Sequence, residues 1–119
     1  MSLTTEAIAT NPQLVRIMVK GSRGIDDLTP EERIQYGFTF LTTFRRLETV
    51  YVQRQLGLID PELTEGFERS VLSILTGRGA AEWWQSTKPA FSTAFADYVD
   101  SQIASGQFVS IYTDLGAPE

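Results

Sequence analysis

The 119-residue sequence contains no cysteine and no histidine. Without these residues the chain cannot form disulfide bonds, a cysteine–histidine or Ser-His-Asp nucleophile system, or a zinc site with nitrogen or sulfur ligands. Carboxylates, lysine, arginine, tyrosine, serine and threonine are the side chains left for chemistry. The lack of cysteine fits a reducing compartment as well as an oxidising one, so it does not locate the protein.

Positive charge and long apolar runs are also scarce. Lysine and arginine number 10 against 15 aspartates and glutamates, which gives a net charge of −5 and a pI near 4.7. Nucleic-acid binding needs a basic face, so we expect no nucleic-acid partner. The apolar stretches are far shorter than the roughly 20 residues of a membrane-spanning helix, and no signal-peptide core is visible. We therefore expect this chain to be soluble.

Proline marks the start of several predicted helices. Asn11-Pro12, Thr29-Pro30 and Asp60-Pro61 each place a side-chain acceptor before a proline, the pattern of an N-cap followed by the first helical residue. Glu32 follows Thr29 by three residues, which predicts a capping box. These signals predict an all-α protein.

The predicted fold is a single compact bundle of five to six helices that spans residues 1–119. Its central element is a long helix over about residues 30–56, followed by an antiparallel helix after a short link. The other predicted helices are 3–10, 12 to Gly21, 61 to Gly77, a short one that carries both tryptophans and ends before Pro89, and one from Ser92 to Gly106. Residues 107–112 alternate as a strand would, but we expect them to lie against the bundle. Residues 1–10 and 113–119 are expected to be peripheral or frayed.

The long helix is predicted to be apolar over more than half its circumference, which requires several neighbours. The predicted apolar arc contains Ile34, Phe38, Phe40, Leu41, Phe44, Leu47, Tyr51, Val52 and Leu56. The predicted solvent face contains Gln35, Thr39, Thr42, Arg46, Thr49 and Gln53. In the next helix, the predicted buried side contains Leu63, Phe67, Val71, Ile74 and Leu75.

Glu48 falls inside this apolar arc, so we expect it to be at least partly buried. A buried carboxylate is costly unless it is paired or protonated. The functional interpretation is a ligand site with a carboxylate of raised pKa in an aromatic pocket. Its candidate residues are Glu48, Tyr51, Gln55, Arg45, Phe44, Trp83 and Trp84. The structural interpretation, which we favour, is an ion pair with Arg45, Arg16 or Arg69 that sets helix register.

The adjacent Trp83 and Trp84 also allow two interpretations. Neighbouring helix positions point about 100° apart, so one indole could enter the core while the other forms a ligand shelf or partner anchor near the surface. The alternative, which we favour, is that both close the end of the bundle. Gly77-Arg78-Gly79 lacks the residues of a phosphate loop. The aspartate pairs Asp26-Asp27 and Asp97/Asp100 lack the spacing of calcium ligands. We predict no catalytic residue, metal or cofactor.

Several segments together resemble an uncharacterised bacterial all-helical domain family. They are Asp27-Leu-Thr-Pro-Glu-Glu-Arg33, Arg46-Leu-Glu48-Thr-Val-Tyr51, Gly57-Leu-Ile-Asp-Pro-Glu62, Glu82-Trp-Trp84 and Pro89-Ala-Phe-Ser-Thr-Ala-Phe95-Ala-Asp-Tyr-Val-Asp100. The resemblance covers most of residues 11–104 and brings no established activity or site residues. Its members commonly carry one membrane-spanning helix before the domain. The resemblance thus implies that Met1-Ser2-Leu3 replaces a removed segment and that the natural protein is tethered at the cytoplasmic face of the inner membrane.

Three functions remain open at this point. The first is a non-enzymatic helical interaction module that works through a protein partner or through self-association. The second is a bundle that binds a small ligand or lipid in a pocket around Glu48, lined by Phe38, Phe44, Tyr51 and a tryptophan. The third, which we favour least, is an enzyme that uses Glu48 as a general acid or base.

Overall fold

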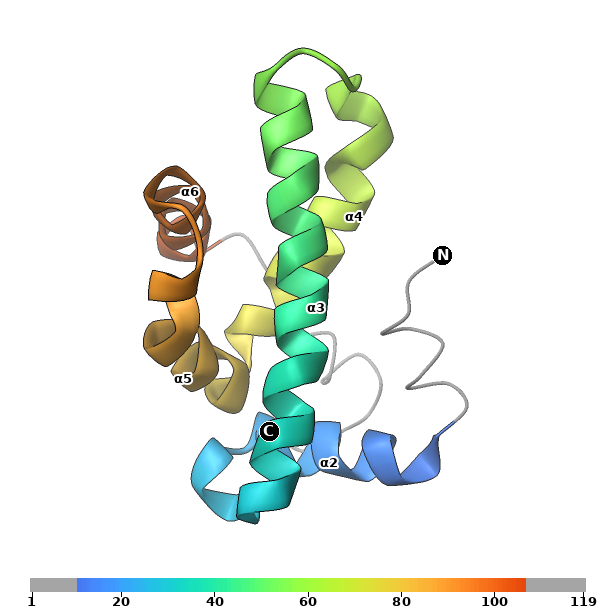
Figure 1. Cartoon of the computed structure of the whole chain (residues 1–119), viewed down its shortest axis with the longest axis vertical. Coiled ribbons are helices and arrows are strands. Elements are labelled where there is room, and N and C mark those ends of the chain that lie inside the picture. The colour runs from blue at the N-terminus through green and yellow to red at the C-terminus, as the bar shows by residue number, and fades with distance from the viewer. Residues whose placement is uncertain (1–10, 107–119) are drawn as a thin grey trace.

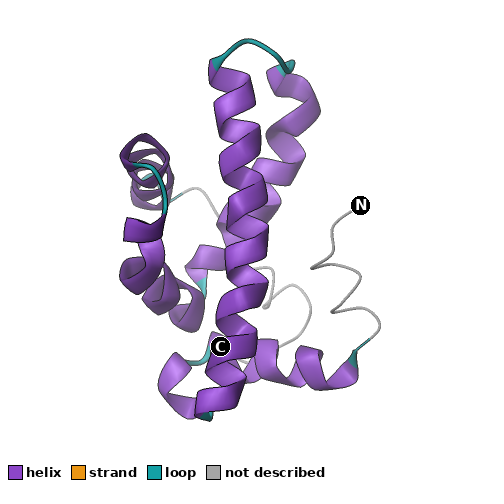
Figure 2. Cartoon of the chain, in the orientation of Figure 1, coloured by secondary structure: helices purple, strands orange, loops and turns teal. Residues whose placement is uncertain are grey.

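The computed structural model describes residues 11–106, and this part of the chain is all-α (Figures 1 and 2). Five α-helices and three short 3₁₀-helices occur among these residues, with no strand. In chain order they are α2 (Pro12–Ser22), η1 (Ile25–Asp27), α3 (Pro30–Gln55), α4 (Pro61–Ser73), η2 (Ile74–Thr76), α5 (Arg78–Thr87), η3 (Lys88–Ala90) and α6 (Thr93–Ala104). The predicted all-α fold class is confirmed, while the predictions for residues 3–10 and 107–119 lie outside the described residues.

The predicted helix starts are confirmed by the hydrogen bonds that cap them. The side-chain oxygens of Asn11, Asp60 and Ser92 accept backbone N–H groups at the starts of α2, α4 and α6. At the start of α3, the Thr29 hydroxyl accepts the Glu32 N–H at 3.2 Å, and the Glu32 carboxylate accepts the Thr29 N–H at 2.9 Å. These caps satisfy donors that have no partner within the helix.

Helix α3 is the longest described element, with 26 residues, and runs without a break through Gly37. It lies at the centre of the view in Figure 1, and α4 returns beside it as its antiparallel neighbour. α3 ends where Gly57 adopts a φ of 72°, a conformation that suits glycine. The predicted central helix and its antiparallel partner are therefore confirmed.

A cluster of aromatic residues forms the part of the core that joins three helices. Phe44 packs against both indoles, with ring centroids 5.3 Å from Trp83 and 5.7 Å from Trp84. Phe95 of α6 extends the cluster, and its ring lies 6.1 Å from that of Trp84. The core therefore joins α3, α5 and α6 through direct ring contacts.

Gly21 differs from its predicted role as a helix terminator. It is a buried residue inside α2, which continues to Ser22. A Cβ at Gly21 would overlap the Tyr36 ring, and a Cβ at Gly79 would overlap the carbonyl of Gly21. Both glycines therefore let α2, α3 and α5 approach closely, which no local capping signal reveals.

The apolar arc predicted for α3 is too wide. The fully buried line of this helix consists of Tyr36, Phe40, Thr43, Phe44 and Leu47. Four residues predicted to be covered are exposed instead, at 59% for Ile34, 64% for Phe38, 45% for Val52 and 67% for Leu56. The neighbouring helices leave this edge of the arc open. The predicted solvent face is largely right, since Gln35, Thr42, Arg46 and Thr49 are exposed.

The buried face of α4 is also rotated relative to the prediction. Val71 and Leu75 are buried as predicted, but Thr64, Glu68 and Leu72 are buried as well, whereas Leu63 is 79% exposed. α4 ends at Ser73, and η2 then leads to Gly77. The rotation matters because it buries the carboxylate of Glu68, which is not among the residues predicted to be buried.

No helix within residues 11–106 is both long enough and apolar enough to cross a membrane.

Candidate functional site

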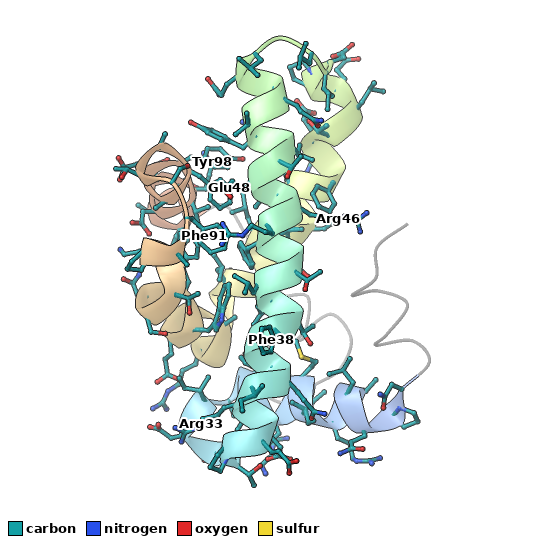
Figure 3. The ribbon with its side chains drawn as sticks, in the orientation of Figure 1. Arg33, Phe38, Arg46, Glu48, Phe91 and Tyr98 are labelled. Carbon is teal, nitrogen blue, oxygen red and sulfur yellow. The ribbon has the colours of Figure 1, made fainter. Side chains whose placement is uncertain are left out.

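Glu48 is partly buried and joins α3 to the start of α6. Its side chain is 17% exposed, and one carboxylate oxygen accepts from the Arg45 guanidinium at 3.0 Å. The other oxygen accepts the backbone N–H of Ser92 at 3.0 Å. Arg45 also donates to the Ala90 carbonyl and lies 4.5 Å above the Phe91 ring. Figure 3 shows Glu48 on the side of α3 that faces α6.

This geometry matches the structural interpretation of Glu48, in which Arg45 was one of three candidate partners. Tyr51 and Gln55 do not complete a polar cluster around the carboxylate. The Tyr51 ring packs on Tyr98, with centroids 4.8 Å apart, and Gln55 is exposed near the end of α3. Within the described residues, no hydrogen bond joins either of them to Glu48.

The aromatic members of the predicted ligand site form solid core. Phe44 and Trp84 are fully buried, and Trp83 is nearly so. The Trp84 indole N–H donates to Asp100 at 2.8 Å, which ties α5 to α6. Both tryptophans are thus core residues, and neither presents its ring as a surface shelf.

The most deeply buried carboxylate of the described residues is Glu68, which the sequence interpretation missed. Its exposed fraction is 4%, and Arg54 pairs with it at 2.8 Å. The hydroxyl groups of Thr64 and Tyr98 donate to it at 3.0 and 2.8 Å. Glu68 therefore links α3, α4 and α6 with every carboxylate oxygen engaged.

Burial, together with the hydrogen bond to Glu68, raises the pKa of Tyr98 to about 12. The phenol is thus held in its neutral form, as a hydrogen-bond donor.

The sequence contains a signal for the observed buried face of α4. A stripe of residues recurs at helical spacing, namely Thr64, Glu68, Val71, Leu72 and Leu75. The side predicted to be buried, which begins at Leu63, is more apolar than this stripe.

A polar cleft opens beside Glu68, with a volume of about 250 Å³. Its walls include Arg54, Glu65, Arg69 and Tyr98. Two further cavities in the described part have volumes of about 200 and 180 Å³, and all three are smaller than the roughly 300 Å³ at which small-molecule pockets begin. Neither Glu48 nor a tryptophan lines any of them. Residues 11–106 contain no group of three carboxylates placed to hold a metal ion.

Exposed apolar side chains gather at the turn between α3 and α4. Leu56, Leu58 and Leu63 lie within eight residues of one another and are 67%, 70% and 79% exposed. We call these three residues the hairpin tip. Single exposed leucines are ordinary on a protein surface, whereas a cluster of them is typical of an interaction site. In Figure 1 this turn projects beyond the other helices.

The backbone beneath the hairpin tip is fixed by local hydrogen bonds. The N–H of Leu58 donates to the carbonyl of Gln53 at 2.9 Å, and the N–H of Gly57 donates to that of Arg54 at 3.0 Å. This pair of bonds is a Schellman motif. Two residues after Leu58, Asp60 caps α4, with Pro61 in its first turn. The turn therefore holds its leucines on a rigid backbone, although Leu58 does not pack down on the helix.

A comparison with protein-family models, curated proteins and solved structures found no match for this chain. The functional conclusion therefore depends on the site geometry.

Proposed function

We propose that this domain is a non-enzymatic helical interaction module that binds a partner protein through the hairpin tip. The observation that carries the proposal is the group of three highly exposed leucines on a hydrogen-bonded turn. Rigid presentation favours binding, because fewer backbone conformations are lost when the partner docks. The adjacent Val52, one helical turn before Leu56, extends the apolar surface along α3.

The core chemistry supports a scaffold role for the rest of the molecule. Glu48 and Glu68 have their oxygens engaged by arginines, hydroxyls or backbone N–H groups. A general acid or base needs an oxygen that can reach a substrate proton. The aromatic residues around Glu48 fill their own space, so they support helix packing better than a ligand pocket.

The resemblance to a bacterial helical family supports a second element of this proposal. In that family, a membrane-spanning helix commonly precedes the domain. A tethered module of this kind would present its hairpin tip at the cytoplasmic face of the inner membrane.

Site-specific photo-crosslinking in the source cell tests the interaction. A photoreactive amino acid replaces Leu58 or Leu63 in two variants and the less exposed Val15 of α2 in a control. We expect a discrete crosslinked protein from positions 58 and 63 and none from position 15. Crosslinks of equal yield from all three positions, or from none, would contradict the proposal.

A further inference from the structure

The surface around the hairpin tip carries charge of one sign. Between Leu56 and Glu65 the sequence has three acidic residues, Asp60, Glu62 and Glu65, and no basic residue. All three are exposed. The end of α3 contributes partial negative charge and the start of α4 partial positive charge of similar size, so the carboxylates determine the sign.

The nearest cations neutralise only part of this surface. Arg54 is committed to the buried Glu68 at 2.8 Å. Arg69 lies one turn beyond Glu65, and the closest approach of the two charged groups is 3.8 Å, with both side chains largely exposed. Such an exposed pair contributes little. The hairpin tip is therefore a group of leucines bordered by three carboxylates, whose negative charge Arg69 offsets only in part.

From this charge pattern we infer that the hairpin tip docks a basic amphipathic helix of its partner, an inference that rests on the proposed function. The apolar face of that helix covers Leu56, Leu58 and Leu63. Lysine or arginine side chains at its edge meet Glu62 and Glu65. Apolar contact supplies affinity, while the complementary charges guide association and fix orientation.

The same charges disfavour two other occupants. A second copy of this chain would bring two sets of three carboxylates together, on molecules with a net charge of −5 each. An anionic lipid surface would repel the tip, because membranes of that kind attract basic rather than acidic segments. A basic helix is the occupant whose positive charge complements the carboxylates beside the hairpin tip.

Synthetic peptides test this inference. The probe is a fluorescent amphipathic helix of leucine and lysine, compared with peptides in which glutamine or glutamate replaces every lysine and with a scrambled leucine–lysine peptide. Fluorescence anisotropy measures binding to the full chain. We expect the leucine–lysine helix to bind at least about tenfold more tightly than each of the others, because its charge and its apolar face both match.

Two double variants locate the binding site. Leu58→Ser/Leu63→Ser and Glu62→Gln/Glu65→Gln should each weaken binding of the leucine–lysine helix by about tenfold or more. The control is Ile34→Ser/Phe38→Ser, which removes an exposed apolar pair from the first half of α3, far from the turn, and should leave binding unchanged. Circular dichroism verifies that all three variants keep their helices.

Each contrary result has a distinct meaning. Equal binding of the glutamine peptide would overturn the basic partner while leaving an apolar interaction site. Loss of binding in the Ile34→Ser/Phe38→Ser control would overturn the location of the binding site. Dimerisation of the native chain that Leu58→Ser/Leu63→Ser abolishes would overturn the basic helix as occupant. Binding to anionic lipid vesicles that exceeds binding to the peptide would overturn it in favour of a membrane. Failure of the photo-crosslinking experiment would count against the proposed function separately.

Discussion

Glu68 and Glu48 are both paired carboxylates, but their surroundings differ enough to predict different mutational effects. Glu68→Ala leaves Arg54 and the Tyr98 hydroxyl without their partner in a site where the carboxylate is 4% exposed. Breaking a buried pair of this kind costs about 3–5 kcal/mol. Glu48→Ala should cost only about 1 kcal/mol, because exposed Arg45 regains water and one hydrogen bond to the Ser92 N–H is lost.

Urea unfolding midpoints of the two variants measure this difference. Glu65→Ala is the matched control, since Glu65 is exposed on the same helix as Glu68 and its removal should change the free energy of unfolding by less than about 0.5 kcal/mol. A Glu68→Ala midpoint close to that of Glu65→Ala would show that the network contributes no net stability.

Tyr98 predicts a dependence of stability on alkaline pH. Its pKa is about 12 in the folded protein, above the ordinary value of 10.0. A raised pKa means that the folded state favours the neutral phenol, so this contribution is complete below pH 10 and is lost as the pH rises through 12. Tyr98→Phe should remove the corresponding part of the decline. Urea midpoints of both proteins between pH 9 and 12 measure the effect, and identical pH profiles would contradict it.

Asp100 predicts the opposite behaviour in acid. Burial acts to raise the pKa of this carboxyl, but hydrogen bonds from Trp84 and Lys88 outweigh it and hold the pKa below its ordinary value. Its stabilising contribution is therefore present above about pH 4 and is lost as the pH falls through the folded-state pKa. The difference in free energy of unfolding between native protein and Asp100→Asn should shrink below pH 4. Asp97→Asn, on the same helix, serves as the exposed control, and a constant difference would rule out this role.

At the scale of helices, the close approach of α2 and α5 predicts contrasting effects of two glycine substitutions. Gly79→Ala should destabilise the protein by about 3 kcal/mol, because the new methyl group would overlap the Gly21 carbonyl and force the helices apart. Gly66→Ala in α4 should instead stabilise by about 0.5–1 kcal/mol, since open space surrounds that position. Thermal unfolding distinguishes the two, and equal effects would show that the crossing is looser than described.

Helix starts followed from the sequence because their causes are local. Thr29 with Glu32, and Asp60 with Pro61, contain the capping interaction within a few residues. Which face a helix buries depends on distant neighbours, so Leu63 and Phe38 were placed wrongly. Glu68 was missed because its burial also depends on other helices. Arg54 of α3 and Tyr98 of α6 donate the hydrogen bonds that make this buried position suitable for a carboxylate.

For the whole molecule, the described part measures 41 × 27 × 24 Å, and its most exposed large apolar side chains are those of the hairpin tip. Leu58→Ser/Leu63→Ser should leave the free energy of unfolding unchanged within about 0.5 kcal/mol, since both side chains already face water. Phe95→Ala, in the core, should cost about 3–5 kcal/mol. Urea unfolding measures the free energy of unfolding of both variants. A large decrease for Leu58→Ser/Leu63→Ser would mean that the hairpin tip stabilises the fold.

The hydrogen-bonded turn between α3 and α4 also bears on proteolysis. Proteases bind their substrates in extended form, and the exposed Leu58 would be an attractive site in a flexible loop. Here its N–H is held by Gln53, and Asp60 holds the start of α4 only two residues further on. Cleavage at Leu58 thus requires the turn to open first, so the rate of limited proteolysis there reports how often the hairpin opens locally.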